Sequence, residues 1–171
     1  TGMGAEIGDD LTSHSDINFV TFTGSTVVGQ HINEICAKNK TPSTLELGGK
    51  SPTIVLADAD LDKVMPLAAR SIFMFAGQAC IGSSRFYVEK PIYAEFVKRF
   101  TMICGKVGMG DLRDPNTVIA PIISDRQRQR VKDHIADAVA KGATVAAGGE
   151  WEGNRCQPTL LTDVSEEMIV C

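Results

Sequence analysis

The stretch Ile17–Gly29 reads INFVTFTGSTVVG, and its pattern changes halfway along. Its first part, Ile17–Phe22, is a short run rich in β-branched and aromatic residues, which is typical of a strand. A glycine turn follows at Thr23–Thr26. Apolar residues then recur at helical spacing, at Val28, Ile32, Ile35 and Cys36. Strand, glycine turn and helix in this order predict an α/β fold.

The rest of the chain continues this alternation. Further short strands are predicted at Ser43–Leu47, Thr53–Leu56, Phe86–Val88, Thr144–Ala147 and Thr159–Leu161. Helices with one apolar face are predicted over Leu61–Phe73, from Pro91 to Val107, and from a Ser124 cap to a stop at Gly142, the last with Val131, Ile135 and Val139 facing inward. This alternation favours an α/β layout over an all-α or all-β one.

Composition narrows the class of protein. The 171 residues include 17 Lys and Arg against 21 Asp and Glu, a net charge of −4, and the length fits about one average domain. Because there is no clustered basic run, nucleic acid and anionic membranes are not expected partners. No apolar stretch approaches the ~20 residues that span a bilayer, and no signal peptide opens the chain.

Cysteine usage points to a reducing compartment. The chain has Cys36, Cys80, Cys104, Cys156 and Cys171, an odd number with no Cys-x-x-Cys pair. A disulfide framework or a zinc site is therefore not expected, no metal is predicted, and a cytoplasmic location is the default. The loop-like opening TGMG and the unfinished ending EEMIVC indicate a piece of something longer.

The first segment with possible chemistry is the glycine turn itself. A strand that ends in a glycine turn at a helix N-terminus offers free backbone N–H groups and the positive end of the helix dipole to a phosphate. The turn is not a P-loop, because Gln30 stands where that motif needs its lysine. A plain tight turn between strand and helix is the alternative.

The second segment is Leu45–Pro52, LELGGKSP, where the single carboxylate Glu46 lies in an apolar strand before a Gly-Gly turn. Burial in that strand would disfavour the charged form and make Glu46 a usable base near neutral pH. An ion pair between Glu46 and Lys50 at the strand end is the alternative.

The third segment is Phe73–Arg85, FMFAGQACIGSSR, in which Gly and small residues surround Cys80 after a hydrophobic helix. This setting is expected to expose the thiol and to bring backbone N–H groups close to it. A free cysteine has a pKa of about 8.5, so only a small fraction is thiolate at pH 7 and a nearby base would matter. Cys36 and Cys104, which lie on predicted amphipathic helices, are expected to be buried and inert.

Together and in this order, the three segments resemble the aldehyde dehydrogenase superfamily over essentially the whole chain. FTGSTVVG (residues 22–29) looks like the family's coenzyme turn, LELGGKSP its glutamate signature and FMFAGQACIGSSR its cysteine signature. Glu46 and Cys80 are separated by the family's spacing of 80 − 46 = 34 residues.

The resemblance implies roles for these residues. Cys80 would be the nucleophile and Glu46 the general base. The coenzyme diphosphate would lie on Gly24, Ser25, Thr26, Val27, Val28 and Gly29. The implied coenzyme is NAD, with NADP not excluded, and the implied partner is a small aldehyde.

The implied reaction oxidises the aldehyde to the acid through a thiohemiacetal and a thioester on Cys80, followed by hydrolysis with Glu46 as base. The region from Asp111 onward is most similar to bacterial members that act on aromatic aldehydes of the benzaldehyde, vanillin and salicylaldehyde type. The alternative is a truncated, non-redox module whose thiol still reacts, esterase-like, or which only binds a partner.

The resemblance also divides the chain. Residues 1–47 look like the end of a Rossmann-like coenzyme domain and 48–171 like the start of the α/β catalytic domain, so the fold would be partial. An upstream Asn and Lys, a downstream Glu-x-Phe-Gly-Pro segment and the family's oligomerisation arm lie outside these residues. Phe75-Ala76 replaces the more usual Asn-Gln pair before Gly77.

A homo-oligomer is predicted as well. The apolar faces of Leu61–Phe73 and Ile92–Val107 are expected to need cover from another chain, because monomers rarely expose large apolar patches.

Overall fold

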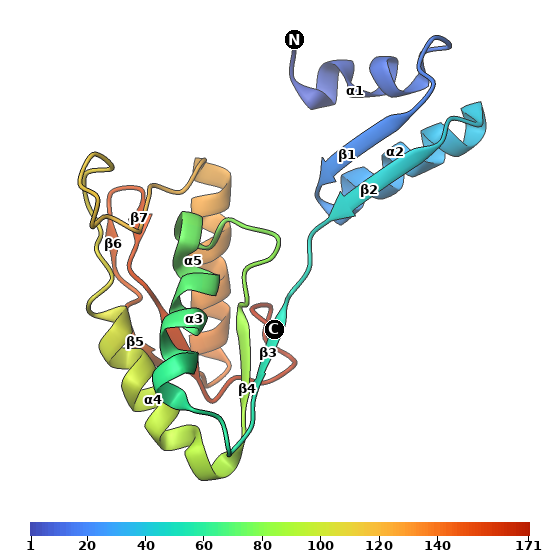
Figure 1. The fold of residues 1–171 in the computed structure, drawn as a ribbon. Coiled ribbons are helices and arrows are strands. Elements are labelled where there is room, and N and C mark those ends of the chain that lie inside the picture. Colours follow the sequence, from blue (N-terminus) through green and yellow to red (C-terminus); the bar gives the residue numbers. More distant parts are fainter. The chain divides into compact units, whose positions relative to one another are not determined.

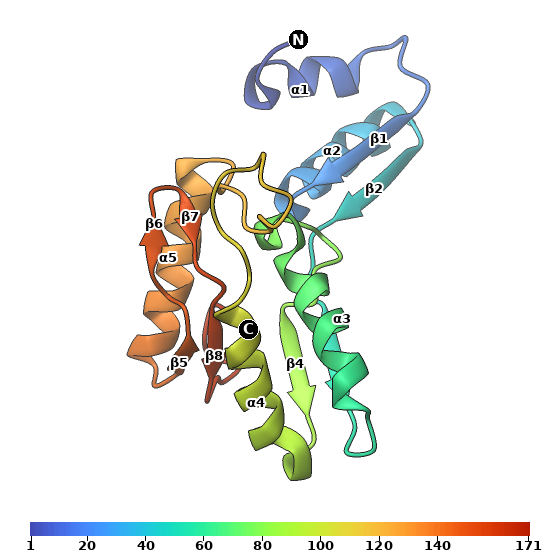
Figure 2. The same cartoon turned by 60° about the vertical axis from the view of Figure 1, so that its left-hand side comes forward.

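The computed structural model describes all residues, 1–171, and they form two compact units, Thr1–Gly49 and Lys50–Cys171. Figures 1 and 2 show helices and strands in both units, in alternation as far as α4 and then as α5 followed by four short strands, which makes an α/β fold. The break between the units follows Gly49, two residues after the predicted domain end at Leu47. The assignment of the two units to a coenzyme and a catalytic domain stays a prediction.

The first unit is built around a strand–helix–strand motif. Its elements are α1 (Gly4–Ser13), β1 (Val20–Gly24), α2 (Thr26–Asn39) and β2 (Ser43–Leu47). β1 and β2 pair in parallel, with Val20 opposite Ser43 and Gly24 opposite Leu47. The predicted strand began too early, because the Ile17 N–H donates to the His14 carbonyl at 3.1 Å and closes a turn there.

Helix α1 was not predicted, since only the opening TGMG was described, as loop-like, and no element was assigned from there to Ile17. Its apolar side chains Ile7 and Leu11 are four residues apart but exposed, and its one buried residue is Thr12, so burial of an apolar face contributes little to this helix. Contacts with α2 hold it: Asp9 pairs with the His31 ring at 2.8 Å. The Asn39 side chain also donates to the Ser13 carbonyl at 3.0 Å. Tertiary contacts therefore stabilise this helix.

The second unit contains the remaining elements. They are β3 (Pro52–Val55), α3 (Leu61–Phe73), the short 3₁₀ helix η1 (Met74–Gly77), β4 (Arg85–Val88), α4 (Lys90–Cys104), α5 (Asp125–Ala140), β5 (Thr144–Ala147), β6 (Trp151–Glu152), β7 (Arg155–Cys156) and β8 (Leu160–Thr162). β3 pairs with β4 in parallel, whereas β5 pairs with β8 and β6 with β7 in antiparallel fashion. Each predicted helix and strand of this unit is present within a few residues of its expected bounds.

Two details of the second unit differ from the prediction. In α5, Val139 is 48% exposed, and its neighbour Ala138 is the fully buried residue, packed with Ala143 and Met168. The β6–β7 hairpin was not predicted, because each strand has two residues and shows no period-two pattern.

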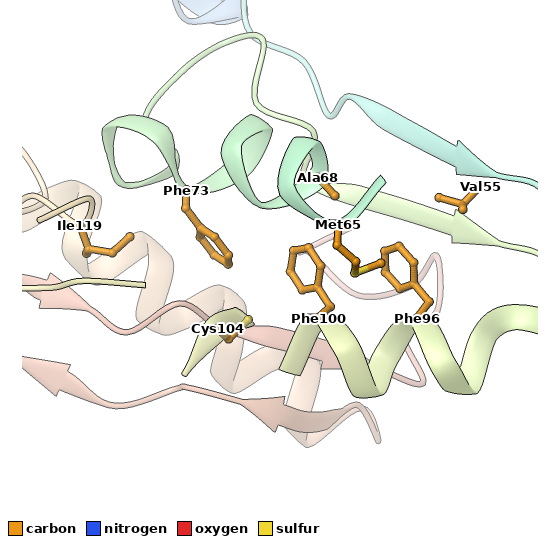
Figure 3. Packing of buried hydrophobic residues seen from close by; sticks show 8 residues of the cluster. All are labelled: Val55, Met65, Ala68, Phe73, Phe96, Phe100, Cys104 and Ile119. Carbon is orange, nitrogen blue, oxygen red and sulfur yellow. The ribbon is translucent and has the colours of Figure 1, made fainter. Parts of the chain in front are cut away.

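The core of the second unit lies between α3, α4 and the β3–β4 pair (Figure 3). Phe96 and Phe100 stack on α4 with ring centroids 5.7 Å apart, and Phe86 of β4 packs on both. Helix α3 contributes Met65, Ala68 and Phe73 to the cluster in Figure 3, and Val55, Cys104 and Ile119 complete it. The apolar faces of α3 and α4 thus pack on each other within one chain, so the predicted reason for an oligomer, that these faces lack cover, is wrong.

The length and hydropathy of the helices decide whether any of them can cross a membrane. The longest, α5, has 16 residues, and none is both long and apolar enough to cross a membrane.

Candidate active site

The Gly24–Gly29 turn joins β1 to α2 as the sequence predicts. Gly24 is the last residue of β1, Ser25 is the N-cap of α2, and Thr26 is the first helical residue. The Ser25 hydroxyl accepts a hydrogen bond from the Val28 N–H at 3.4 Å. The N–H groups of Thr26 and Val27 have no intrahelical acceptor, as at any helix N-terminus. Val27 is 76% exposed, so this helix end is open to a ligand.

Both glycines of the turn have packing reasons as well. Gly29 is buried, and a Cβ there would lie 2.4 Å from Leu47 Cδ2, so glycine lets α2 approach β2 closely. A Cβ on Gly24 would lie 2.4 Å from the Phe22 ring. Glycine at these positions therefore serves the local fold whether or not a phosphate binds.

A cavity of about 720 Å³ adjoins the turn within the first unit. Its walls are mainly apolar and come from α1, from β1 with the residues just before it, and from Val28, His31 and Ile32 of α2. The volume falls within the ~300–1,000 Å³ of typical small-molecule sites. Val28, in the first turn of α2, is part of the cavity wall, so the cavity begins close to this helix N-terminus.

Glu46 lies next to the turn. In the parallel pairing it is opposite Thr23, one residue before the Gly24–Leu47 pair. Its side chain is exposed, whereas Leu45 and Leu47 on either side are partly buried. The expectation that an apolar strand buries Glu46 is therefore wrong: successive side chains of a strand point to opposite faces, and Glu46 takes the open one.

Cys80 lies in the loop between η1 and β4 and is exposed. The Gly82 N–H donates to the Ala79 carbonyl at 3.0 Å and closes a turn around the cysteine. Gly82 itself is buried, and a Cβ there would lie 3.1 Å from that carbonyl. The predicted exposure of this thiol in a glycine-bearing loop is confirmed.

The other four thiols are in different surroundings. Cys36 and Cys104 are buried, as predicted, and burial raises the pKa of Cys104 to about 11. Cys156 and Cys171 are half-buried, and burial also raises the pKa of Cys156. Cys80 is thus the one thiol of the five that combines exposure with a loop position.

The backbone before Cys80 has an uncommon conformation. Phe75 and Ala76 have φ angles of 54° and 55°, and Gly77 follows at 73°. Non-glycine residues adopt this left-handed region rarely, and Asn tolerates it better than Phe or Ala. The departure from the Asn-Gln pair therefore falls on two residues whose backbone is strained.

Sequence reasoning missed one residue of this loop, Gln78. Its side-chain amide bonds to the loop and to the segment Pro121–Ile123, more than 40 residues along the chain. Its position between Gly77 and Cys80 could have marked it as a residue of the site, but its hydrogen-bond partners could not be predicted from the sequence.

The structure thus brings Glu46 and the glycine turn together in the first unit and places Cys80 in the second. Among the His, Cys, Asp and Glu side chains, no group of three or more is arranged to hold a metal ion.

Comparison with known proteins finds a family match over the whole chain. The aldehyde dehydrogenase family profile matches residues 1–171. Succinate-semialdehyde dehydrogenase [NADP(+)] of Escherichia coli is 42% identical over 167 residues, which are 96% of this chain and 35% of that protein. Glutarate-semialdehyde dehydrogenase of Pseudomonas putida is 39% identical over 171 residues, 99% of this chain and 36% of that protein.

Solved structures agree. An NAD⁺ complex of aldehyde dehydrogenase from Bacillus cereus matches 99% of this chain with a TM-score of 0.93 and 39% identity. Betaine aldehyde dehydrogenase from Staphylococcus aureus in complex with NAD⁺ matches with a TM-score of 0.94 and 33% identity, again over 99% of this chain. The chain spans 35% of each of these two structures, so the similarity covers about a third of a complete relative.

Proposed function

We propose, since the chain belongs to the aldehyde dehydrogenase family, that it forms the cysteine-bearing part of an enzyme that oxidises an aldehyde to a carboxylic acid with NAD or NADP. The observation that carries this proposal is the environment of Cys80. It is the one exposed thiol, in a tight loop, while the other four are buried or half-buried.

Cys80 acts as the nucleophile. Its thiolate adds to the aldehyde carbon, a C–S bond forms, and the carbonyl oxygen takes the electron pair to give a thiohemiacetal. NAD, when bound, supplies the acceptor for the hydride that this carbon loses. The acyl group then stays on sulfur as a thioester, which divides one difficult oxidation into two easier steps.

Glu46 serves the second step as general base. It takes a proton from water, and the water oxygen adds to the thioester carbon. The C–S bond then breaks, which restores the Cys80 thiolate and releases the carboxylic acid. Exposure of Glu46 on the open face of β2 favours this role, because a carboxylate that activates water must be reached by water.

The glycine turn holds the coenzyme diphosphate. The N–H groups of Thr26 and Val27 and the positive end of the α2 dipole suit two phosphates without any lysine. The adjoining cavity of about 720 Å³ takes a further part of the dinucleotide beside Val28. Nothing in this turn discriminates NAD from NADP.

The substrate proposed is an aromatic aldehyde of the benzaldehyde or salicylaldehyde type. Its support is the similarity of the region from Asp111 onward to members that act on such compounds. The matched relatives named above are dehydrogenases of succinate semialdehyde and glutarate semialdehyde, so acidic aliphatic aldehydes are the competing class.

The test is the absorbance of NADH or NADPH after mixing the chain with NAD or NADP, respectively, and with either salicylaldehyde or succinate semialdehyde. We expect NADH with the aromatic aldehyde and none in Cys80→Ala. Faster turnover of succinate semialdehyde would overturn the substrate assignment.

A second function stays open because the chain spans 35% of its relatives. If no NADH forms but a nitrophenyl ester is cleaved in a Cys80-dependent way, the chain is a non-redox module with a reactive thiol.

A further inference from the structure

The Cys80 loop is tied to a distant part of the second unit by one side chain. Gln78 Oε1 accepts a hydrogen bond from the Ile123 N–H at 2.9 Å. Gln78 Nε2 donates to the Phe75 carbonyl at 3.1 Å and points to the Pro121 carbonyl at 3.5 Å. Its own backbone N–H also donates to Phe75, at 3.1 Å. Both ends of the amide are thus engaged, two residues before the cysteine.

The backbone that Gln78 holds is strained. Phe75 and Ala76 occupy the left-handed region, a strained conformation that non-glycine residues keep only where the surrounding structure holds them in it. The Phe75 carbonyl receives two bonds from Gln78, one from the backbone and one from the side chain. The bonds of Gln78 therefore act on the strained residue itself.

The side chains of this loop also favour a different arrangement. Phe75 and Ile81 are 65% and 73% exposed, although both are large and apolar. If the loop were released, hydrophobic burial would draw these side chains toward the unit, and Cys80, next to Ile81, would move with them.

We infer that Gln78 is a positioning residue for the nucleophile: its amide clamps the Cys80 loop to Pro121–Ile123 and keeps the thiol presented. The inference rests on the proposed function only in calling Cys80 the nucleophile. The hydrogen bonds of Gln78 are independent of that function. The segment Pro121–Ile123 thereby becomes part of the site, although it lies more than 40 residues from Cys80 in the sequence.

The test compares thiol reactivity in Gln78→Met, which keeps the side-chain length and removes both hydrogen-bonding groups. Iodoacetamide labelling followed by peptide mapping gives the rate for each cysteine, and the ratio of the Cys80 rate to the Cys156 rate is the readout. We expect this ratio to fall roughly two- to tenfold, the range that one net hydrogen bond supports. The fall must come from a slower Cys80, with the Cys156 and Cys104 rates unchanged. A merely structural role would instead loosen the unit, and the rates of Cys156 and Cys104 would rise.

Two further variants keep the test decisive. Gln129→Met is the matched control, because Gln129 bonds only to Asp133 within α5, and its ratio should stay at the wild-type value. Ile123→Pro removes the N–H that Gln78 accepts and should lower the ratio as Gln78→Met does. The ratio in the double variant should be close to that of either single variant, because both changes remove the same hydrogen bond between Ile123 and Gln78. Gln78→Glu, which keeps the acceptor, should recover part of the ratio.

An unchanged ratio in both Gln78→Met and Ile123→Pro would overturn the inference, and so would additive effects in the double variant. Neither outcome depends on aldehyde or coenzyme. A chain that makes no NADH yet shows the expected ratios would therefore refute the proposed function and leave the positioning role standing.

Discussion

At the scale of single residues, the five thiols differ by environment and not by chemistry. Cys36 and Cys104 are 1% and 5% exposed, each on a helix face that packs inward. Desolvation disfavours the thiolate, so the pKa of Cys104 rises to about 11. Cys80 has neither cover nor a helix around it. The same side chain is thus inert in one place and available in another.

Limited alkylation should follow this order. At pH 8 we expect iodoacetamide to modify Cys80 first, then the half-buried Cys156 and Cys171, and Cys36 and Cys104 last. Peptide mapping at a substoichiometric dose measures the order. Labelling of Cys104 ahead of Cys80 in the folded chain would contradict the assignment of the nucleophile. Cys80→Ala provides the control in which the fast phase disappears.

Glu46 offers a test of the two halves of the reaction. In Glu46→Gln the amide keeps the size of the side chain but cannot accept a proton from water, so hydrolysis should slow by ~10²–10⁴-fold. Hydride loss should still occur once. We expect a burst of NADH near one equivalent per site and an acyl adduct on Cys80 by intact mass.

The matched control is Glu34→Gln, an exposed carboxylate on α2 in the same unit, which should turn over normally. Unimpaired steady-state turnover in Glu46→Gln would assign the base to another group. A slower burst would show that Glu46 also assists Cys80.

At the scale of elements, the start of α2 combines a structural and a binding role. Gly24 and Gly29 have close neighbours in Phe22 and Leu47, so replacing either glycine would disturb packing and binding together. The first helical residue, Thr26, separates the two roles, because proline at this position is compatible with a helix and removes only the backbone N–H.

Thr26→Pro should therefore weaken NAD binding while α2 stays folded. Ser25 already has an extended backbone, with φ −73° and ψ 149°, as a residue before proline prefers. A hydrogen bond to a charged phosphate is worth ~1.5–3 kcal/mol, so titration calorimetry should show roughly tenfold weaker binding or more. Thr26→Ala, which keeps the N–H, is the control. Equal affinity in Thr26→Pro and Thr26→Ala would place the diphosphate elsewhere.

Helix α5 shows what a cap contributes on its own. Ser124 is its N-cap, and the hydroxyl accepts from the Gln127 N–H at 3.3 Å, as the sequence predicted. Ser124→Ala should lower the free energy of unfolding by about 1 kcal/mol in urea denaturation, because one helical N–H loses its partner. Ser124→Asp restores an acceptor and should be close to wild type. An unchanged free energy of unfolding in Ser124→Ala would show that the cap contributes nothing.

At the scale of the whole molecule, apolar surface is left exposed although α3 and α4 pack on each other. Ile54 of β3 and Leu67 of α3 are 70% and 68% exposed. A cleft of about 770 Å³ opens in the second unit, with apolar side chains from β4, α4 and β8 in its walls. The strand pairs are two-stranded, so their outer edges are unpaired. Such edges and patches favour association with other chains.

We therefore expect a dimer or larger species. Multi-angle light scattering at micromolar concentration should give a mass above that of one chain and rise with concentration. Ile54→Lys, which places a charge on exposed β3, should shift the mass toward the monomer, whereas Lys63→Ala, an exposed change on α3, should not. A single monomeric mass across the concentration series would contradict this prediction.

The elements with strong periodicity could be predicted from the sequence. The apolar spacing of α2, α3 and α4 and the cap of α5 specify helices through local rules, and the three motifs specify the family. The exposure of Cys80 follows in the same way from the Gly and small residues around it. These features depend on neighbours within a few residues, so the local sequence is sufficient to predict them.

Contacts between distant residues decided the rest. Helix α1 buries no large apolar side chain, and contacts with α2 hold it, namely the Asp9–His31 pair and the hydrogen bond from Asn39 to Ser13. The strained backbone at Phe75 is held by Gln78, which in turn depends on Ile123. Whether Glu46 faced the interior depended on which face of β2 was covered, because alternation fixes two faces and packing chooses between them. Local rules thus determined the strongly periodic elements, the motifs and the exposure of Cys80. Only the tertiary structure determined the exposure of Glu46, the strain at Phe75 and the partner that holds the cysteine loop.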